Sequence, residues 1–240
     1  MGNVTFNNIS STSLGVEIET FPDYVAPQKI YEVTHIPGRN GDLVMDTKTY
    51  ANVPREYAIS IATYDRIAFS EKMAKVVEWL HSASGYARLE DSYDALVYRK
   101  AYFKDELGIN NIFDAAGRAT IKFICKPQRY LKTGETSTTF TTAGTIQNQT
   151  INDAFPLLNI VTDNTEGTVS IGNYSFEILA GSGTHITMDC ELQDAWYQAE
   201  NKNNFIVLNG EYPRIAPGTQ TISFTGGVQS VEVTPRWWIV

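Results

Sequence analysis

This chain of 240 residues contains only two cysteines, and it has no long apolar run and no excess of positive charge. The two cysteines, Cys125 and Cys190, form no C-x-x-C pair and lie in strand-like runs between apolar neighbours. We therefore expect buried free thiols and no disulfide. No apolar run approaches the roughly 20 residues that a membrane span needs, so we expect no membrane insertion.

The balance of charge is acidic. Asp and Glu number 27 against 19 Lys and Arg, which gives a net charge of −8. A protein whose main task is to neutralise phosphates carries the opposite balance, so specific nucleic-acid binding is not expected. The N-terminus, Met1 to Phe6, has neither a basic start nor an apolar signal core, and we expect an intracellular product.

Motifs for catalysis, metals and phosphates are also lacking. The three histidines, His35, His81 and His185, are scattered and fit no metal-ligand spacing. The segment from Gly181 to His185 fails the nucleophile pattern G-x-S-x-G, because Ala180 and Thr184 stand where glycines are needed. We interpret it as a hairpin turn. The sequence therefore predicts no cofactor and no metal.

Acidic residues offer the one remaining route to an enzyme. A glycoside hydrolase needs only two carboxylates at a suitable distance. The candidates are Glu90, Asp91, Asp94, Glu191 and Asp194. Acids in loops are ordinarily solvated, and catalysis needs burial and pairing that shift a pKa. We therefore expect no enzyme.

One segment has a helical period. Between Ser70 and Ser84, Met73, Val76, Val77 and Leu80 recur at helical spacing. Ser70 suits an N-cap and Gly85 a C′ position, so the pattern predicts a single long helix between them.

Elsewhere the period is two, which predicts a mainly β protein. Residues 57–62 and 119–125 alternate apolar and small or polar side chains, as strands with one buried face do. The dipeptides Gly172-Asn173, Asn209-Gly210 and Gly226-Gly227 predict turns. Residues 132–149 change to Thr, Ser, Gly and Gln, as a linker or as entry strands do. We place a domain boundary near Leu131, with domains 1–131 and 132–240.

Paired aromatics stand out in the second domain. Trp196-Tyr197 and Trp237-Trp238 flank strand-like segments, where such pairs usually fill a core or an interface. Exposed aromatics also stack on sugar rings, and Trp196 and Tyr197 are therefore candidate sugar-stacking residues.

The segment from Ile36 to Asp42 is built as a projecting loop. It joins two strand-like stretches and contains Pro37, Gly38, Arg39, Asn40, Gly41 and Asp42. Proline fixes one φ, the glycines permit positive φ, and the aspartate can bond its own backbone. We expect Arg39 near the tip and take Pro37 to Asp42 as a candidate oligomer or partner interface, with an ordinary surface loop as the alternative.

Several blocks together resemble the distal tail proteins, or Dit proteins, of long-tailed bacteriophages. Ile36 to Asp42 resembles the family's Pro-Gly-Arg-Asp-Gly loop with Asn40 in place of the acid, and Phe123 to Tyr130 matches its F-x-C-x-P-x-x-Y. The order along the chain supports the resemblance as much as any single block. The further blocks are Trp79-Leu80, Leu89 to Asp91, Phe155 to Ile160, Ile186 to Glu191 and Tyr212 to Gly218.

The resemblance implies an architecture and a role. It implies a β-sandwich-like, ring-forming N-terminal domain with one helix, and a C-terminal galectin-like or jelly-roll β-sandwich. Six copies would form a ring that joins the major tail tube protein to the tail-associated tip protein, with a receptor-binding protein as a further partner. DNA would pass through the ring without specific binding, eased by acidic walls. The protein would reside at the virion's tail tip after synthesis in the host bacterial cytoplasm.

Two other classes of function stay open at the level of sequence. The C-terminal sandwich could act as a carbohydrate-binding adsorption module, for which Trp196 and Tyr197 would supply the stacking surface. A glycoside hydrolase is the third class, disfavoured for the reasons given above.

Overall fold

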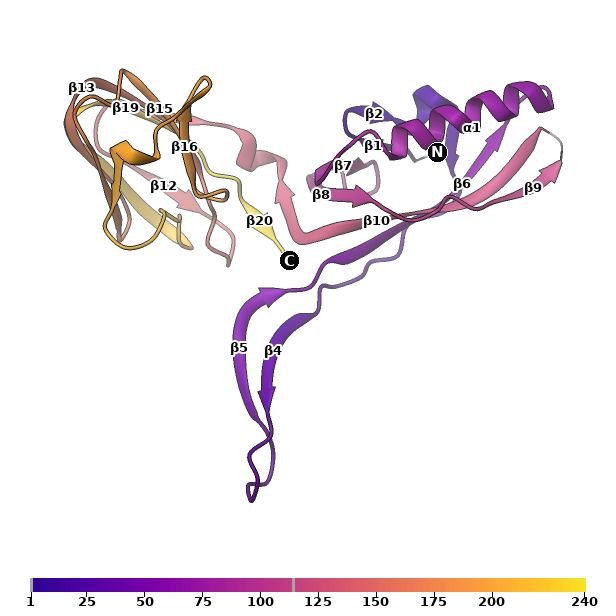
Figure 1. The fold of residues 1–240 in the computed structure, drawn as a ribbon, viewed down its shortest axis with the longest axis horizontal. Helices are drawn as coiled ribbons and strands as arrows, with labels where there is room; N and C mark the ends of the chain where they lie inside the picture. The colour runs from indigo at the N-terminus through magenta and orange to yellow at the C-terminus, as the bar shows by residue number, and fades with distance from the viewer. Residues whose placement is uncertain (1, 114) are drawn as a thin grey trace. The chain divides into compact units, whose positions relative to one another are not determined.

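The computed structural model describes residues 2–113 and 115–240, and the chain forms two compact units. Unit 1 runs to Arg129 and includes Val240; unit 2 comprises Tyr130–Ile239. Figure 1 shows the elements of both in chain order. The fold class predicted from the sequence is confirmed: the protein is mainly β with curled sheets, and α1 is the only α-helix in the described part of the chain.

Unit 1 is built on a curled antiparallel sheet in the order β2-β1-β7-β8-β10-β6-β3, with β9 paired to β10. The strands are β1 (Val4–Phe6), β2 (Ile9–Ser10), β3 (Val16–Ile18), β6 (Val53–Ala62), β7 (Ala87–Asp91), β8 (Val97–Phe103), β9 (Ile109–Phe113) and β10 (Ala116–Leu131), and a 3-10 turn spans Ser11–Leu14. The alternation predicted for β6 and β10 is confirmed, since Tyr57 and Ile59 pair with Ile121 and Ala119 and all four are buried. These side chains form the core of unit 1.

Helix α1 (Arg66–Leu80) packs on this core through Phe69, Val76, Trp79 and Leu80. The Trp79 indole N–H donates to the carbonyl of Phe6, 3.1 Å away. The predicted helix limits are wrong by about one turn at each end. The Asp65 side chain accepts the N–H of Ala68 and caps the helix, so Ser70 lies inside it. The helix ends at Leu80 with His81 as its C-cap, before Gly85.

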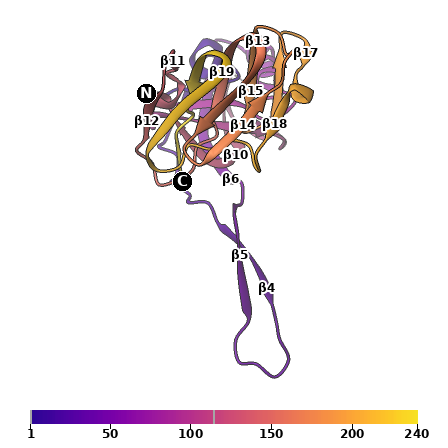
Figure 2. The same cartoon turned by 90° about the vertical axis from the view of Figure 1, so that its left-hand side faces the viewer.

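Unit 2 is a sandwich made from two long strands that take part in both layers. Figure 2 shows these strands, β13 (Leu157–Ile171) and β19 (Gly218–Thr234), side by side. The shorter strands of the sandwich are β11 (Thr138–Phe140), β12 (Gly144–Asn148), β14 (Tyr174–Ile178), β15 (His185–Asp189), β16 (Asp194–Tyr197), β17 (Glu200–Asn201) and β18 (Ile206–Leu208), with 3-10 turns at Lys132–Glu135 and Asn203–Phe205. The last strand, β20 (Trp238–Ile239), lies outside this sheet. Because β11 and β12 pair with β19, the entry-strand interpretation of residues 132–149 is right and the linker interpretation is wrong.

A bulge marks the corner between the layers. The pairing of β13 with β19 shifts register between Thr162 and Gly167, and Gly226 stands opposite Gly167 with a φ of 66°. Before the bulge β13 pairs with β15, and after it with β14. Strands that change sheets at a bulge close a sandwich without a loop. Gly226-Gly227 therefore lies within a strand, and the turn predicted there is wrong.

Two loops of unit 2 test the turn predictions. Gly172-Asn173 joins β13 to β14 with Ile171 opposite Tyr174, so the predicted hairpin is confirmed. Gly181 to His185 does not form a hairpin, because β14 and β15 each pair with β13 and not with each other. The core beneath is continuous and includes Leu158, Ile160, Phe176, Met188 and Val231.

Candidate functional site

Strands β4 (Lys29–Thr34) and β5 (Leu43–Tyr50) form a two-stranded sheet of their own, which we call the arm. Residues 30–49 are all exposed, so neither face of the arm packs on the rest of unit 1. Figure 1 shows the arm as a ribbon joined through its two ends to the body of the sheet. An isolated hairpin is marginal in water, so the arm needs internal devices or a partner to hold its form.

The internal devices lie near the base of the arm. The pairing shifts register between Ile30 and Tyr31, and Lys48 there adopts a left-handed φ of 57°. The Asp46 carboxylate accepts the Lys48 N–H at 2.8 Å and the Lys29 ammonium at 2.6 Å, and both bonds lower the pKa of Asp46. The bulge increases the twist of the ribbon and directs the strands beyond it.

The predicted loop occupies the tip of the arm. Gly38 and Gly41 have φ angles of 82° and 78°, which a residue with a Cβ rarely adopts. The Arg39 N–H donates to the carbonyl of Ile36 at 3.2 Å. Across the loop, the His35 ring nitrogen Nδ1 lies 3.2 Å from the Asp42 carboxylate oxygen Oδ1. Pro37, Gly38, Arg39, Asn40, Gly41 and Asp42 are exposed, as a projecting loop requires. The Arg39 guanidinium makes no hydrogen bond or ion pair within the described residues.

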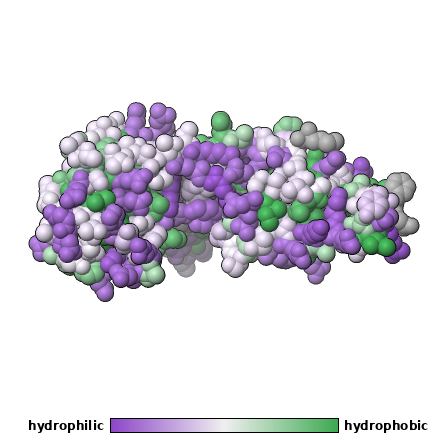
Figure 3. Space-filling model, turned by 90° about the horizontal axis from the view of Figure 1, so that it is seen from above, coloured by the Kyte–Doolittle hydropathy of each residue, from purple (hydrophilic) through white to green (hydrophobic). Residues whose placement is uncertain are grey.

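Both faces of the arm carry exposed apolar side chains. Tyr31, Val33 and Val44 share one face, and the two valines are 57% and 56% exposed. Ile30, Leu43 and Met45 occupy the other face. On the body face drawn in Figure 3, by contrast, hydrophobic residues are interspersed with hydrophilic ones. Uncovered apolar faces and free strand edges are features of a surface that binds another chain.

Sequence reasoning recognised the two stretches as strand-like but placed only the loop Pro37 to Asp42 in the candidate interface. The two stretches show no clean alternation, because both of their faces carry apolar groups and neither is covered within the subunit. A signal was available in the pairing of two β-rich stretches around a turn with apolar residues at facing positions, such as Val33 opposite Val44.

A buried ionic cluster holds the sheet close to the base of the arm. The Asp91 carboxylate accepts the Tyr57 hydroxyl at 2.7 Å and the Arg55 guanidinium at 3.0 Å, with Arg99 3.8 Å away. Arg55 also donates to the carbonyl of Asp23 at 2.9 Å, in the segment that leads to the arm. The cluster therefore links β6 and β7 to the irregular segment that leads into the arm.

The protonation states within the cluster follow from its geometry. Burial acts to raise the pKa of Asp91, but the Tyr57 hydrogen bond and the Arg55 charge outweigh it and leave that pKa below its usual value. Burial and the neighbouring carboxylate raise the pKa of Tyr57. Burial raises the pKa of Cys125 beside the cluster to about 12. Asp91 is thus a fixed anion, whereas a general acid needs a raised pKa.

The other candidate acids are also engaged. Asp94 contacts Arg99 at 3.0 Å and Glu90 pairs with Arg88. In unit 2, Glu191 lies 3.8 Å from Arg236, and Asp194 accepts the side-chain amide of Asn203 at 2.8 Å. The expectation of solvated loop acids is wrong for Asp91, which is buried and accepts hydrogen bonds from Arg55, Tyr57 and the backbone N–H groups of Tyr93 and Asp94 in place of water. Cys125 and Cys190 are buried and free, as predicted, and the three histidines are exposed.

The hollow nearest to the cluster is too small for a ligand. It lies between Tyr24, Pro54, Arg55 and Arg129 and has room for about 20 Å³, the space of a single water. Within residues 2–113 and 115–240, no three His, Cys, Asp or Glu side chains gather as metal ligands would. No helix of this part of the chain is long and apolar enough to span a membrane.

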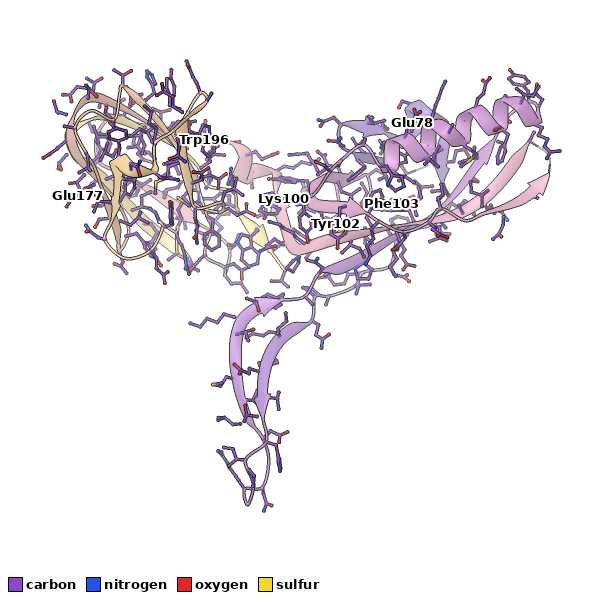
Figure 4. The ribbon with its side chains drawn as sticks, viewed as in Figure 1. Glu78, Lys100, Tyr102, Phe103, Glu177 and Trp196 are labelled. Atoms are coloured by element: carbon purple, nitrogen blue, oxygen red, sulfur yellow. The ribbon has the colours of Figure 1, made fainter. Side chains whose placement is uncertain are left out.

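The aromatic candidates of unit 2 lie in two different settings. Trp196 and Tyr197 are half-buried in β16, and Tyr197 stacks on His185 with ring centres 5.2 Å apart. Figure 4 labels Trp196 among the side chains of that strand. Trp238 donates its indole N–H to the carbonyl of Asp153 at 2.8 Å, and Trp237 packs on the core. The second pair is therefore structural.

Comparison with known proteins gives structural neighbours only. No family model matches the sequence, and no curated protein does either. The crystal structure of the Dit protein of phage SPP1, described as a paradigm of the hub adsorption apparatus in phages that infect Gram-positive bacteria, matches with a TM-score of 0.72 and 11% identity over 100% of both chains.

Two structures of the phage P2 baseplate in its activated conformation also match. The calcium form has a TM-score of 0.60 and 12% identity over 97% of each chain. The strontium form has a TM-score of 0.57 and 12% identity over 97% of this chain and 98% of the other. At such identities the likeness establishes the fold, which is Dit-like along the whole chain and confirms the resemblance seen in the sequence.

Proposed function

We propose that this chain is a structural hub at the distal end of a phage tail, acting as a connector without enzymatic activity. Six copies form a ring between the tail tube protein and the tail-associated tip protein, and DNA passes through the ring. A receptor-binding protein is a further partner, and the assembled protein resides in the virion after synthesis in the host cytoplasm. The observation that carries the proposal is a full-length Dit-like fold with an arm that is apolar on both faces.

The arm supports a ring in particular. A closed ring of identical subunits requires a heterologous interface, in which one surface of a subunit binds a different surface of the next. The arm offers apolar area on both faces, free strand edges, and the free guanidinium of Arg39 at its tip. In this proposal residues 1–131 form the ring and residues 132–240 the outward galectin-like domain, and Pro37 to Asp42 bind the neighbouring subunit or a tail partner.

Native mass spectrometry of the full chain tests the ring. We expect hexamers, or pairs of them, whose population falls on dilution. Arg39→Ala should weaken assembly without lowering the melting temperature, because a guanidinium suits bidentate capture of a carboxylate on a neighbour. Arg66→Ala is the matched control, since Arg66 is exposed at the start of α1 and makes no ion pair in the described part of the chain. Monomer alone at micromolar concentration would contradict the proposal.

A second candidate function is carbohydrate binding through unit 2. The observation that favours it is the half-exposed Trp196 in β16 beside the stacked rings of His185 and Tyr197. Aromatic faces bind the C–H faces of sugars, and a hub can carry such a site as well as an assembly role. Glycan-array binding by the full chain tests this candidate independently of ring formation.

A further inference from the structure

One row of side chains crosses the outer face of a single layer of unit 2. The register places Glu232 opposite Asn159, Asn159 opposite Thr187, and Thr187 opposite Trp196, across β19, β13, β15 and β16. We call these four residues the Glu232 row. Their chain neighbours Ile160, Ile186 and Val231 are buried, so the row itself faces outward.

Hydrogen bonds along the row fix its planar groups. The Asn159 amide donates to the Glu232 carboxylate at 3.1 Å and accepts the Thr187 hydroxyl at 2.9 Å. The Ser137 hydroxyl donates to the other carboxylate oxygen at 2.6 Å. The bonds from Ser137 and Asn159 lower the pKa of Glu232, so the carboxylate is charged at neutral pH. All four side chains of the row are half-buried, which limits their freedom further.

The row keeps unused hydrogen-bonding capacity. Each Glu232 oxygen has further lone pairs, and Asn159 has a second amide hydrogen. The indole N–H of Trp196 donates to no group within the described residues. An ordinary outer sheet face carries flexible charged side chains, whereas this one presents a carboxylate, an amide and a hydroxyl in fixed positions beside an aromatic ring.

This chemistry fits a saccharide. Carboxylates and amides bind the hydroxyl groups of sugars, and an indole ring packs against the apolar face of a pyranose. Glu232 and Trp196 lie three strand spacings apart, or about 14 Å, the length of a short oligosaccharide. The charge of the row also limits the kind of saccharide that it can bind. The Glu232 carboxylate has no cation beside it in the row, so it repels phosphate-bearing polymers and favours neutral sugars.

We propose that the Glu232 row is a binding face for a short neutral oligosaccharide, with Trp196 as the stacking platform and Glu232 and Asn159 as hydroxyl ligands. The inference deepens the carbohydrate-binding candidate and adds Asn159, Thr187 and Glu232 to its site. It does not depend on ring formation.

Saturation-transfer difference NMR on the full chain provides the test. The probes are lactose, maltose and N,N′-diacetylchitobiose as neutral ligands and poly(glycerol phosphate) as an anionic one. We expect transfer to at least one neutral probe and none to the anionic polymer. Binding of the anionic polymer alone, or of no probe at millimolar concentration, overturns the proposal.

Variants then locate the site. Trp196→Ala and Glu232→Gln should each weaken binding about tenfold or more, in line with the loss of an aromatic platform or of a charged hydrogen bond. Glu177→Gln is the matched control, since Glu177 is exposed on β14 in the other layer, away from Trp196 in Figure 4. Binding that survives both row variants overturns the proposal. An unchanged hexamer mass in these variants separates its failure from that of the hub.

Discussion

At the scale of residues, the two units use the same device to fix their chain. Asp91 in unit 1 and Asp189 in unit 2 are both buried and both bonded to an arginine, and each also accepts backbone N–H groups of the next turn. Such a carboxylate holds a strand end and a loop together at one point. Because the groups are desolvated, removal of one partner costs much more than an exposed pair contributes.

The first prediction at this scale concerns Asp91. Asp91→Asn removes the charge that faces Arg55 and Arg99, and we expect it to lower the free energy of unfolding by about 3–5 kcal/mol. Urea denaturation measures the loss. Glu56→Gln is the control, because its pair with Lys122 at 3.0 Å is exposed and should contribute about 0–1 kcal/mol. Equal losses in the two variants would contradict a buried anchor.

The second prediction concerns acid. Burial opposes ionisation of Asp91 and Asp189, but bonds from Tyr57 and Arg236 respectively outweigh it, and both folded-state pKa values lie below the ordinary 3.8. The stability that they contribute is therefore present above pH 3.8 and is lost as pH falls through the folded-state values. We expect the melting temperature to fall steeply below about pH 4, and less steeply in Asp91→Asn. Parallel acid profiles for the two proteins would contradict this.

At the scale of elements, the corner of unit 2 depends on three glycines. A Cβ on Gly167 would lie 2.8 Å from the carbonyl oxygen of Thr225, and Gly227 faces the Asp163 side chain at close range. The strands can cross so closely only without side chains. The bulge therefore depends on these three glycines. The change of layer that closes the sandwich depends on them as well.

Gly226→Ala tests the corner. Gly226 combines a φ of 66° with a backbone oxygen of Glu166 where a Cβ would stand, so the change forces the two long strands apart. We expect a loss of about 2–4 kcal/mol, measured by thermal or urea unfolding. Gly85→Ala is the control, since Gly85 has open space around it and no positive φ, and it should be close to neutral. A neutral Gly226→Ala would show that the corner is relaxed.

At the scale of the whole molecule, contacts within one subunit do not account for the form of the arm. Its residues from Ile30 to Thr49 are exposed, yet its two strands carry six large apolar side chains and its tip carries Ile36. A soluble monomer gains nothing from such a surface, and exposed strand edges favour aggregation. Assembly removes the cost, which is why ring formation and the arm belong to the same proposal.

Limited proteolysis tests this link. The small polar residues between Lys132 and Asn148 would favour cleavage in an open linker, but β11 and β12 are paired there with β19. Trypsin should instead cut first after Arg39 at the exposed tip when the protein is dilute and monomeric. In assembled rings the same bond should be protected at least tenfold. Equal cleavage rates at high and low concentration would exclude the tip from the interface.

The sequence by itself determined the local patterns. Alternation fixed the buried faces of β6 and β10, the apolar period located the helix to within about a turn, and the glycines and proline between Ile36 and Asp42 indicated a projecting loop. Each of these depends on residues a few positions apart, whose spacing the sequence displays directly.

Only the tertiary structure decided what distant residues do together. Asp91 proved to be a buried anchor because Arg55 and Tyr57 reach it from another strand, and Gly226-Gly227 proved to be a corner because Gly167 lies opposite. In the Glu232 row, Asn159 and Glu232 are hydrogen-bonded although they lie 73 positions apart in the sequence. Pairing between strands is set by the closure of long loops and the burial of a shared core, and neither leaves a mark at fixed spacing along the chain.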